Sequence, residues 1–467
     1  MEEDIIKKRL WFVAAIIIAG IIISLPAPEG LTPEGQKTIA LLIMVIILFV
    51  AEAIPMAATA LLIGVFEVVV IGFESNDVAS SYMNDSVFFI MGSLMIAVAL
   101  VKQGIAQKIT LLILSHIGTS VNRIVFGIVA SCALVAAFMS DHTVAALMLP
   151  VALSISKMSG GFKKNPNLTK LLLFAIAFGC AIGGLATPSG GARNIIAIEY
   201  LNSMFNQNIT YLDWMIYAFP VTLIMIPITA LILIKIFKPE ISNLRDATHT
   251  LEEEDEEMIM TPKMWISIGI FLFTLFLWIF SGTLNLGLGI AAIIGAVLYL
   301  IFGLVKWRDY NSGVAWGVVF LYGGAISLGF MMLDTGAGAW IANNFLNFMS
   351  MFVDINGVPV LASAVSILSI ATTNTMSGGA TVSVIGPITL KMAEGAGISV
   401  IVVGMVTAIS SAFAYLLVIG SPANAIIYSS GFVKSKDFLL AGAAMTVISF
   451  IVLLLVVNFY WIGIIGL

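Results

Sequence analysis

The chain has 467 residues, of which 60% are hydrophobic and only 10% are charged, and its formal net charge is −5. A soluble protein of this length needs roughly 25% charged residues to cover its surface, so the composition excludes an ordinary soluble fold and predicts a membrane protein. The two cysteines do not make a disulfide framework, and we expect the lipid bilayer, not a nucleic acid, as the partner of the chain.

The first predicted helix, residues 10–25, follows a basic cluster at residues 7–9 and precedes the acidic residues Glu29 and Glu34. The positive-inside rule then places the N-terminus in the cytoplasm. A cleaved signal peptide begins in a similar way. The segments that follow are equally apolar, so we interpret residues 10–25 as a retained helix and residues 1–37 as an N-terminal helix and loop.

Three more helices are predicted at residues 38–56, 58–73 and 86–101 from the apolar runs and the breakers between them. Glu52 and Glu67 fall within or beside these apolar runs. An acid at that depth either lines an interface between helices or reaches toward water. The sequence does not decide between the two.

The apolar stretch 124–155 is interrupted at its centre by Ser140-Asp141-His142-Thr143 and has basic residues on both flanks. Each apolar arm is too short to cross a bilayer comfortably at about 1.5 Å per residue. We therefore predict a re-entrant helical hairpin that enters and leaves from the cytoplasm. Its polar tip is tolerated inside the membrane only if it is buried in protein or faces a wet cavity.

The next helix is interrupted by the segment Thr187–Asn194, which separates apolar runs at residues 171–186 and 195–200. Interrupted helices are typical of binding sites near the middle of a bilayer. Residues 220–236 return the chain to the cytoplasm. Residues 239–263, with the acidic block Glu252–Glu257, are interpreted as a solvated and mobile cytoplasmic linker.

The second half of the chain repeats this plan, with three helices, a hairpin, an interrupted helix and a last helix. The three helices are expected near residues 264–281, 286–305 and 313–333. The two arms of the hairpin are expected at residues 358–371 and 380–392, around a tip at residues 372–379. The interrupted helix is expected at residues 398–419 before a break at residues 420–424, and the last helix at residues 438–463.

Local matches between the halves support an internal repeat. The segment Phe88–Gly92 matches Phe320–Gly324, Pro150 matches Pro387, and Asn194 matches Asn424. The basic flanks give the two copies opposite orientations in the membrane, which predicts an inverted repeat. The first repeat is residues 38–238 and the second is residues 264–467.

The predicted fold class is thus an all-α integral membrane protein, an inverted-repeat transporter with eleven transmembrane helices, two re-entrant helical hairpins and two interrupted helices. We expect it in the plasma (cytoplasmic) membrane as a multi-pass protein, with its N-terminus inside and its C-terminus outside.

The two tips and the two breaks are predicted to meet at one substrate site. Hydroxyls, amides and free helix N-termini dominate there, and such groups favour an anion. Because each half supplies one set, the site suits a ligand with two separated carboxylates. The candidate substrate-binding residues are Ser140, Asp141, His142, Thr187, Gly190, Arg193, Asn194, Thr373, Asn374, Thr375, Ser377, Ser421, Pro422 and Asn424.

Arg193 is the one arginine of five that falls in a predicted break near the middle of the membrane. A buried charge there normally has a partner, which is either a substrate carboxylate or, permanently, Asp141. His142 lies beside Asp141 at the hairpin tip, and an imidazole titrates near neutral pH. Proton coupling is therefore a further, weaker hypothesis.

Over about residues 10–465 the chain resembles the divalent anion:sodium symporter family, the INDY-type dicarboxylate carriers. Ser421-Pro422-Ala423-Asn424 is similar to the family's loop in the interrupted helix, and Thr373-Asn374-Thr375 to its Ser-Asn-Thr hairpin tip. The resemblance implies an elevator-type homodimer that carries C4 or C5 dicarboxylates such as succinate, malate, fumarate or 2-oxoglutarate. It also implies a scaffold of about residues 10–120 and 264–350, and a moving domain of about residues 121–238 and 355–467.

The chain departs from the family pattern in its first half. Asp141 and His142 replace an asparagine and a threonine, and Arg193 replaces the second proline of the loop. The resemblance implies that these positions frame a sodium site in the coupled members, where a guanidinium could supply the positive charge instead. In the second half, Ser377-Gly378-Gly379 competes with Thr373-Asn374-Thr375 for alignment with the tip motif.

Our hypothesis from the sequence is a sodium-independent dicarboxylate exchanger (antiporter) with no metal or cofactor. The alternative is a sodium-coupled dicarboxylate symporter with Asp141 as an ion ligand. A distant alternative is an intramembrane enzyme that uses Asp141 and His142 as an acid/base pair, although no nucleophile constellation is recognisable. A receptor that does not transport has no distinguishing feature in the sequence.

Overall fold

The computed structural model describes residues 2–351 and 357–467, and within these residues the chain is helical with no β-strand. Seven helical segments there are long and apolar enough to cross a membrane. They are Pro33–Val50, Ser75–Lys102, Pro166–Gly183, Tyr211–Phe237, Pro262–Ile279, Trp316–Asp334 and Ser435–Ile465. Other apolar helices are shorter, so the eleven transmembrane helices stay a prediction.

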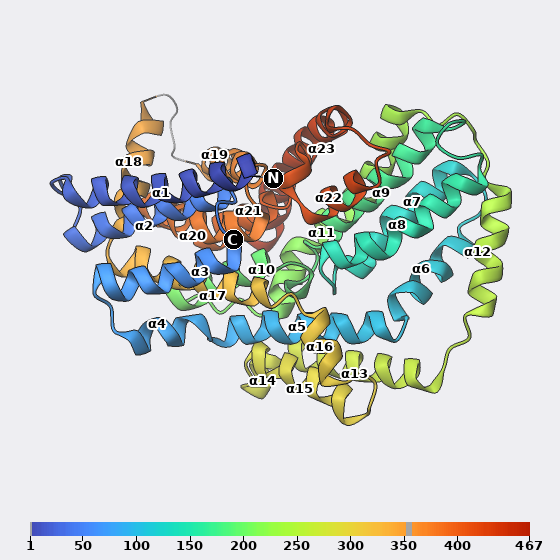
Figure 1. Cartoon of the computed structure of the whole chain (residues 1–467), viewed down its shortest axis with the longest axis horizontal. Helices are drawn as coiled ribbons and strands as arrows, with labels where there is room; N and C mark the ends of the chain where they lie inside the picture. Colours follow the sequence, from blue (N-terminus) through green and yellow to red (C-terminus); the bar gives the residue numbers. More distant parts are fainter. Residues whose placement is uncertain (1, 352–356) are drawn as a thin grey trace.

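The first part of each half corresponds to the predicted scaffold. In the first half it consists of α1 (Glu2–Ser24), α2 (Pro33–Val50), α3 (Met56–Phe66), the π-helical turn η1 (Glu67–Ile71), α4 (Ser75–Tyr82), α5 (Asp85–Lys102) and α6 (Ile105–His116). In the second half it consists of α13 (Pro262–Ile279), α14 (Ser281–Leu284), α15 (Leu288–Ile301), α16 (Trp307–Gly313), α17 (Trp316–Asp334) and α18 (Ala337–Ser350). Helix α15 packs along α5, and α17 packs along α3 (Figure 1).

The turn after α5 and the turn after α17 share one conformation. Gly104 has φ of 74° and Gly336 has φ of 75°, and each precedes the first residue of the next helix. A residue with a side chain is strained in this left-handed region, so glycine suits the sharp change of direction. The two corners lie at equivalent places in the predicted repeats.

The second part of each half contains the predicted hairpins and interrupted helices. The first consists of α7 (Val121–Ala136), α8 (Asp141–Met158), α9 (Pro166–Gly183), η2 (Pro188–Gly190), α10 (Ala192–Glu199), η3 (Tyr200–Met204) and α11 (Tyr211–Phe237). The second consists of α19 (Val358–Thr373), α20 (Gly378–Gly395), α21 (Val400–Ser410), η4 (Val418–Gly420), α22 (Pro422–Ser429), α23 (Ser435–Leu455) and η5 (Val456–Ile465). All four predicted interruptions overlap gaps between helices, but residues 141–143, 192–194 and 422–424 belong to the helices that follow, and the helix predicted to reach residue 419 ends at Ser410.

The largest core surrounds α9, whose residues from Leu171 to Gly183 are all buried. Helices α7, α8 and α11 pack around it. The outward faces of α1, α11, α13 and α23 instead expose large apolar side chains, as a lipid-facing surface requires. Examples are Val13, Ile17, Leu223, Leu272, Leu440 and Val447.

The linker between the halves contains a helix, and one face of this helix is buried. The prediction of a fully solvated linker is therefore wrong for that face. It contains α12 (Arg245–Glu257), which lies beside α6 at the right edge of Figure 1. Leu251 and Asp255 are buried, and the Lys108 ammonium donates a hydrogen bond to Asp255 at 2.7 Å. The periodicity of the buried positions, which a search for charge runs overlooks, puts Glu252–Glu254 on the exposed face.

The two glutamates of the apolar segments, Glu52 and Glu67, have different surroundings in the structure. Glu52 is exposed between α2 and α3, whereas Glu67 is fully buried and accepts a hydrogen bond from the Ser327 hydroxyl of α17 at 2.6 Å. Glu67 therefore lines a helix interface. The predicted boundary at residues 350–355 falls partly on residues 352–356, which lie outside the described residues.

Candidate functional site

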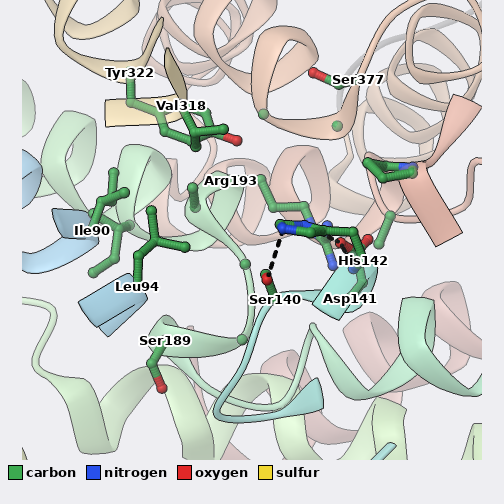
Figure 2. Close-up of a pocket in the computed structure, with 18 of the residues that line it drawn as sticks. Ile90, Leu94, Ser140, Asp141, His142, Ser189, Arg193, Val318, Tyr322 and Ser377 are labelled. Atoms are coloured by element: carbon green, nitrogen blue, oxygen red, sulfur yellow. Dashed lines mark hydrogen bonds and ion pairs between the residues drawn. The ribbon is translucent and has the colours of Figure 1, made fainter. Parts of the chain in front are cut away.

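One cavity of about 220 Å³ lies where four breaks of the chain meet. Its polar wall comes from the α7–α8 turn, the α19–α20 turn, and the breaks within the α9–α10 and α21–α22 pairs. Its apolar wall comes mainly from α5 and α17 and includes Ile90, Leu94 and Val318 (Figure 2). The cavity thus lies between the predicted scaffold and the predicted moving domain.

Eight of the predicted site residues line this cavity, and six do not. The lining residues are Ser140, Asp141, His142, Gly190, Arg193, Ser377, Ser421 and Pro422. The six that are not among the lining residues are Thr187, Asn194, Thr373, Asn374, Thr375 and Asn424.

The first hairpin tip starts helix α8 and is compactly hydrogen-bonded. The Ser140 hydroxyl lies 2.8 Å from the Thr143 hydroxyl and 3.4 Å from His142 Nε2. The Asp141 carboxylate accepts the backbone N–H of His142 at 2.8 Å, which satisfies a free donor at the helix start. The His142 side chain remains 39% exposed at the cavity (Figure 2).

Arg193 is in the first turn of α10 and extends toward this tip (Figure 2). The residue is only 9% exposed, and its Nε and Nη2 atoms have no hydrogen-bond partner among residues 2–351 and 357–467. Asp141 lies within electrostatic range but beyond the 4.0 Å of an ion pair, so the permanent Arg193–Asp141 pair does not form in this structure. A buried guanidinium without a carboxylate partner is costly unless an anion joins it.

The second hairpin tip begins at Ser377, whose hydroxyl accepts the Ala380 N–H at 3.3 Å and caps α20. Pro387 lies nine residues after the first residue of α20, and Pro150 lies nine residues after the first residue of α8. The helix register therefore pairs Ser377 with Ser140, and the match of Thr373-Asn374-Thr375 with the tip motif is corrected. The equivalents of Asp141 and His142 are Gly378 and Gly379.

Thr373 and Asn374 bind backbone groups and do not line the cavity. The Thr373 hydroxyl donates to the carbonyl of Ser411 at 2.6 Å. Asn374 donates to the carbonyl of Ile370 at 2.8 Å and accepts the Leu416 N–H at 3.0 Å. These bonds tie the end of α19 to the break after α21, while Thr375 is exposed and bonds within its own turn.

Asn194 and Asn424 shape the two breaks in the same way. The Asn194 amide donates to the carbonyls of Gly184 and Thr187, each at 2.8 Å. The Asn424 amide donates to the carbonyls ten and seven residues before it at 2.8 and 3.0 Å, which are the same offsets. Unwound carbonyls need such partners, so these predicted binding residues hold the site's backbone.

Thr187 has a similar structural role in the first break. Its hydroxyl donates to the carbonyl of Ala137 in the hairpin turn and lies 3.0 Å from the Ser189 hydroxyl. Ser189 in turn lies 2.9 Å from the hydroxyl of Tyr211 on α11. Together they fix the first break against the first hairpin.

Sequence reasoning missed Tyr322, which projects into the cavity from α17 (Figure 2). Its ring lies against the second tip, where a Cβ on Gly379 would come 2.4 Å from the ring edge and from the hydroxyl. Only glycine leaves room for this contact. Tyr322 belongs to the Phe320–Gly324 segment, which matches Phe88–Gly92 in the first half. We used this match only to align the two halves, although it also marked a segment that lines the site.

A second cavity of about 310 Å³ adjoins the first and shares Leu94, Ser140 and His142 with it. It extends to Lys102 at the end of α5, which forms an ion pair with Asp309. The Lys102 ammonium, together with the Lys306 N–H, holds the pKa of Asp309 below its usual value. The cavity thus has polar groups at both of its ends, Ser140 and His142 at the site and Lys102 and Asp309 at the end of α5.

The site's fixed charges and dipoles favour an anion. Helices α8, α10, α20 and α22 all begin at the cavity, and helix starts carry partial positive charge. Arg193 adds a full charge and Asp141 opposes it. Among the described residues no group of three or more His, Cys, Asp or Glu could hold a metal ion. A sodium ion would depend instead on hydroxyls and on carbonyls of the breaks.

Comparisons with known proteins identify membrane transporters among the relatives of this chain. The sequence model of the family described as "Sodium:sulfate symporter transmembrane region" matches residues 7–467. A Haemophilus influenzae protein named as an uncharacterized transporter is 27% identical over 473 residues, which cover 97% of this chain and 97% of that protein. Two proteins named sodium-dependent dicarboxylate transporter SdcS, from Staphylococcus saprophyticus and Staphylococcus aureus, are 25% and 26% identical, each over 92% of this chain and 87% of the relative.

A solved structure of Neisseria gonorrhoeae MtrF, whose title describes a class of antimetabolite efflux pumps, also resembles the chain. It aligns with a TM-score of 0.58 over 98% of this chain and 94% of that chain, at 12% sequence identity. At this identity the likeness concerns the fold alone.

Proposed function

Since the chain belongs to the sodium:sulfate symporter transmembrane region family, that is, to the divalent anion:sodium symporters, we propose that it transports C4 and C5 dicarboxylates across the membrane. Family membership confirms the prediction of a multi-pass membrane transporter and not an enzyme. Succinate, malate, fumarate and 2-oxoglutarate are the proposed substrates. Relatives that carry the name dicarboxylate transporter support this substrate class.

One observation carries the proposal for this chain's own site. The Arg193 guanidinium is buried beside the cavity without an ion-pair partner, and four helix starts face the same space. A carboxylate near Arg193 and the start of α8 leaves a second carboxylate to reach the hydroxyls of Ser377 and Ser421, which cap α20 and α22. A short molecule with two separated carboxylates matches both sets.

The proposed mechanism is alternating access of the elevator type. Residues 121–238 and 355–467 would move against a scaffold of residues 10–120 and 264–350. The two halves would form an inverted repeat, and the transporter would be a homodimer in the plasma membrane. The equal bonding of Asn194 and Asn424 supports the repeat, and the basic residues near Lys102 favour that end as cytoplasmic, with the C-terminus outside.

The coupling of transport has two candidates. The names of the staphylococcal relatives support sodium-coupled symport better than the sodium-independent exchange that the sequence put first. We therefore propose symport, with Asp141 and break carbonyls as ion ligands. Exchange is the second candidate, because Arg193 already supplies a buried positive charge beside the site. Substrate carboxylate would then neutralise the carrier on each crossing.

Uptake of labelled succinate into proteoliposomes separates these functions. The purified chain is reconstituted with and without internal succinate, and each preparation is assayed in an inward sodium gradient or with choline in place of sodium. Symport predicts uptake into empty liposomes that requires sodium. Exchange predicts uptake that requires internal dicarboxylate and does not change with choline.

A competition panel tests the substrate class in the same preparation. Malate, fumarate and 2-oxoglutarate are expected to reduce succinate uptake, whereas sulfate and acetate are not. Liposomes without protein give the background rate. Absence of dicarboxylate uptake in all four conditions, with sulfate transported instead, would overturn the proposed substrate.

A further inference from the structure

Glu199 is the last residue of α10, at the end of that helix away from Arg193. Its carboxylate accepts hydrogen bonds from the Ser86 hydroxyl, from the Asn84 amide at 3.4 Å and from the Ser203 hydroxyl at 2.7 Å. Ser203 is on its own segment, but Asn84 and Ser86 are the cap and the first turn of α5. The carboxylate therefore joins the predicted moving domain to the predicted scaffold.

The place of this contact on α5 favours a negative charge. Asn84 caps α5 by accepting the Val87 N–H at 3.0 Å, and the first turn of a long helix carries partial positive charge. The Glu199 carboxylate approaches that turn through Ser86. Hydrogen bonds to an ionised carboxylate are stronger than those between neutral groups.

The next residue makes a second bond across the same boundary. The Tyr200 ring is fully buried, and its hydroxyl donates to the carbonyl of Ala325 on α17 at 3.0 Å. It also lies 3.2 Å from the carbonyl of Ser383 on α20. Two consecutive residues at the end of α10 thus bind α5 and α17.

Cavities surround the Glu199 contact at the end of α5 opposite Lys102. Glu199 lines one cavity of about 340 Å³ and another of about 460 Å³. The second shares Phe89 and Ile195 with the 220 Å³ cavity of the site. Glu199 is therefore near the boundary that separates the site from this end of the molecule, and it has space around it to move.

We propose that Glu199 is a positioning residue that holds the end of α10 against the start of α5 in the arrangement described here, and that this contact opens in every transport cycle. The inference rests on the proposed function, because it requires α10 to move against α5. Among the described residues of the second repeat, the contact has no counterpart. The residue equivalent to Glu199 is Ser429, whose hydroxyl donates to Ile426 in its own helix at 2.7 Å. The contact therefore stabilises one end state of the cycle and not the other.

A reversible cross-link between the two helices tests whether the contact must open. The double variant Ser86→Cys/Glu199→Cys is made in a background in which Cys132 and Cys180 are alanine, and succinate uptake is measured before oxidation, after oxidation and after reduction. The control is Ser156→Cys/Thr169→Cys, a pair whose native hydroxyls lie 2.6 Å apart within the moving domain. Mass spectrometry measures the cross-linked fraction of each pair.

Oxidation is expected to lower uptake at least tenfold in the 86–199 pair and to leave the control pair within twofold, with recovery on reduction. Uptake that continues at its original rate in fully cross-linked 86–199 protein would overturn the proposal. If neither pair nor the unmodified chain takes up any dicarboxylate, the proposed function fails instead. The two failures are therefore distinct.

Distances between spin labels test the energetic role without any substrate. Labels are attached at Ser80→Cys on α4 and at Asn208→Cys after η3, both exposed positions at this end. Glu199→Ala removes a hydrogen-bonded carboxylate. The population in which α10 has moved away from α5, relative to the population in the arrangement of this structure, is therefore expected to rise about tenfold. Ser86→Ala should shift the ratio in the same direction by less.

The matched control is Glu394→Ala, because that carboxylate pairs with Lys391 within α20 and crosses no boundary. Its distance distribution should equal that of the unmodified labelled chain. An unchanged distribution in both Glu199→Ala and Ser86→Ala, in protein that elutes as a single species, would contradict the positioning role.

Discussion

The two hairpin tips of this protein share a backbone plan but differ in chemistry. Each tip begins with a serine that precedes a helix containing a proline at the same position, as the starts of α8 and α20 show. The first tip continues with Asp141 and His142, opposite Arg193, whereas the second continues with two glycines against Tyr322. The repeated backbone plan therefore specifies where the site forms. The side chains that follow each capping serine differ between the tips, and they specify what each tip binds.

This comparison changes one expectation about the second half. The likeness of Thr373-Asn374-Thr375 to the family's hairpin tip placed these residues among the candidate substrate ligands. In the structure, Thr373 and Asn374 bind backbone carbonyls and an N–H group, and none of the three lines the cavity. The charged groups of the cavity all come from the first half, so the first half is expected to dominate recognition.

Replacing the buried guanidinium should have the largest effect. Arg193→Ala is expected to lower succinate transport by about 100-fold or more, because the bound carboxylate would lose its proposed partner and breaking a buried charge pair costs about 3–5 kcal/mol. Uptake by proteoliposomes measures the loss. Lys163→Ala, an exposed lysine in the loop before α9, is the control and should transport normally. Normal transport by Arg193→Ala would show that the first half does not dominate recognition.

Adding one methyl group at the second tip tests its tight packing. Gly379→Ala is expected to lower transport about tenfold, because overpacking costs about 1–3 kcal/mol and the new Cβ would meet the Tyr322 ring. A second substitution, Tyr322→Leu, should restore part of the rate. Gly269→Ala on α13, where a Cβ meets nothing within 4 Å, serves as the control.

The outcome for the second tip is decided by the double variant. If Gly379→Ala alone transports at the original rate, the ring is free to move and the tip is less constrained than the first. If Gly379→Ala/Tyr322→Leu remains as slow as the single variant, the glycine is needed for substrate and not for the ring.

Neutralising the first tip's carboxylate tests the coupling. Asp141→Asn keeps a side chain that caps helices well but removes a charge that a sodium ion would use. Under symport, the sodium concentration for half-maximal uptake is expected to rise about fivefold. This change corresponds to the loss of about 1 kcal/mol of interaction between the carboxylate and the sodium ion. Uptake measured against sodium concentration gives this value. A variant whose sodium curve is unchanged would remove Asp141 from the proposed ion site.

Asn194 and Asn424, the asparagines of the two interrupted helices, should differ least between the halves in their contribution to stability. Asn194→Ala and Asn424→Ala each remove an amide that serves two carbonyls, so each should lower the free energy of unfolding by about 1–3 kcal/mol. Denaturation in detergent measures both losses. We expect them to agree within about 0.5 kcal/mol, because the bonds are equivalent. A clearly larger loss for one would show that the breaks are not equivalent.

Much of the architecture could be predicted because its signals are local. The predicted breaks at residues 140–143, 187–194, 372–379 and 420–424 each overlap a gap between helices of the structure, although their bounds differ from those gaps by several residues. The linker was predicted less well, because the buried face of α12 depends on its contact with α6. Among the site residues, Arg193 was recognised as a lone buried cation, and Tyr322 was missed because it comes from a helix with no polar break.

By itself, the sequence determined the membrane environment, the long apolar helices and the approximate places of the four interruptions. Helices in a membrane satisfy their own backbone hydrogen bonds, so apolar length and local breakers are enough to locate them. Only the tertiary structure decided which polar groups face the cavity. Asn194, Asn374 and Asn424 bind carbonyls from the breaks, and Ser377 replaces Thr373 at the tip, because the partners of each group lie on segments brought together by folding.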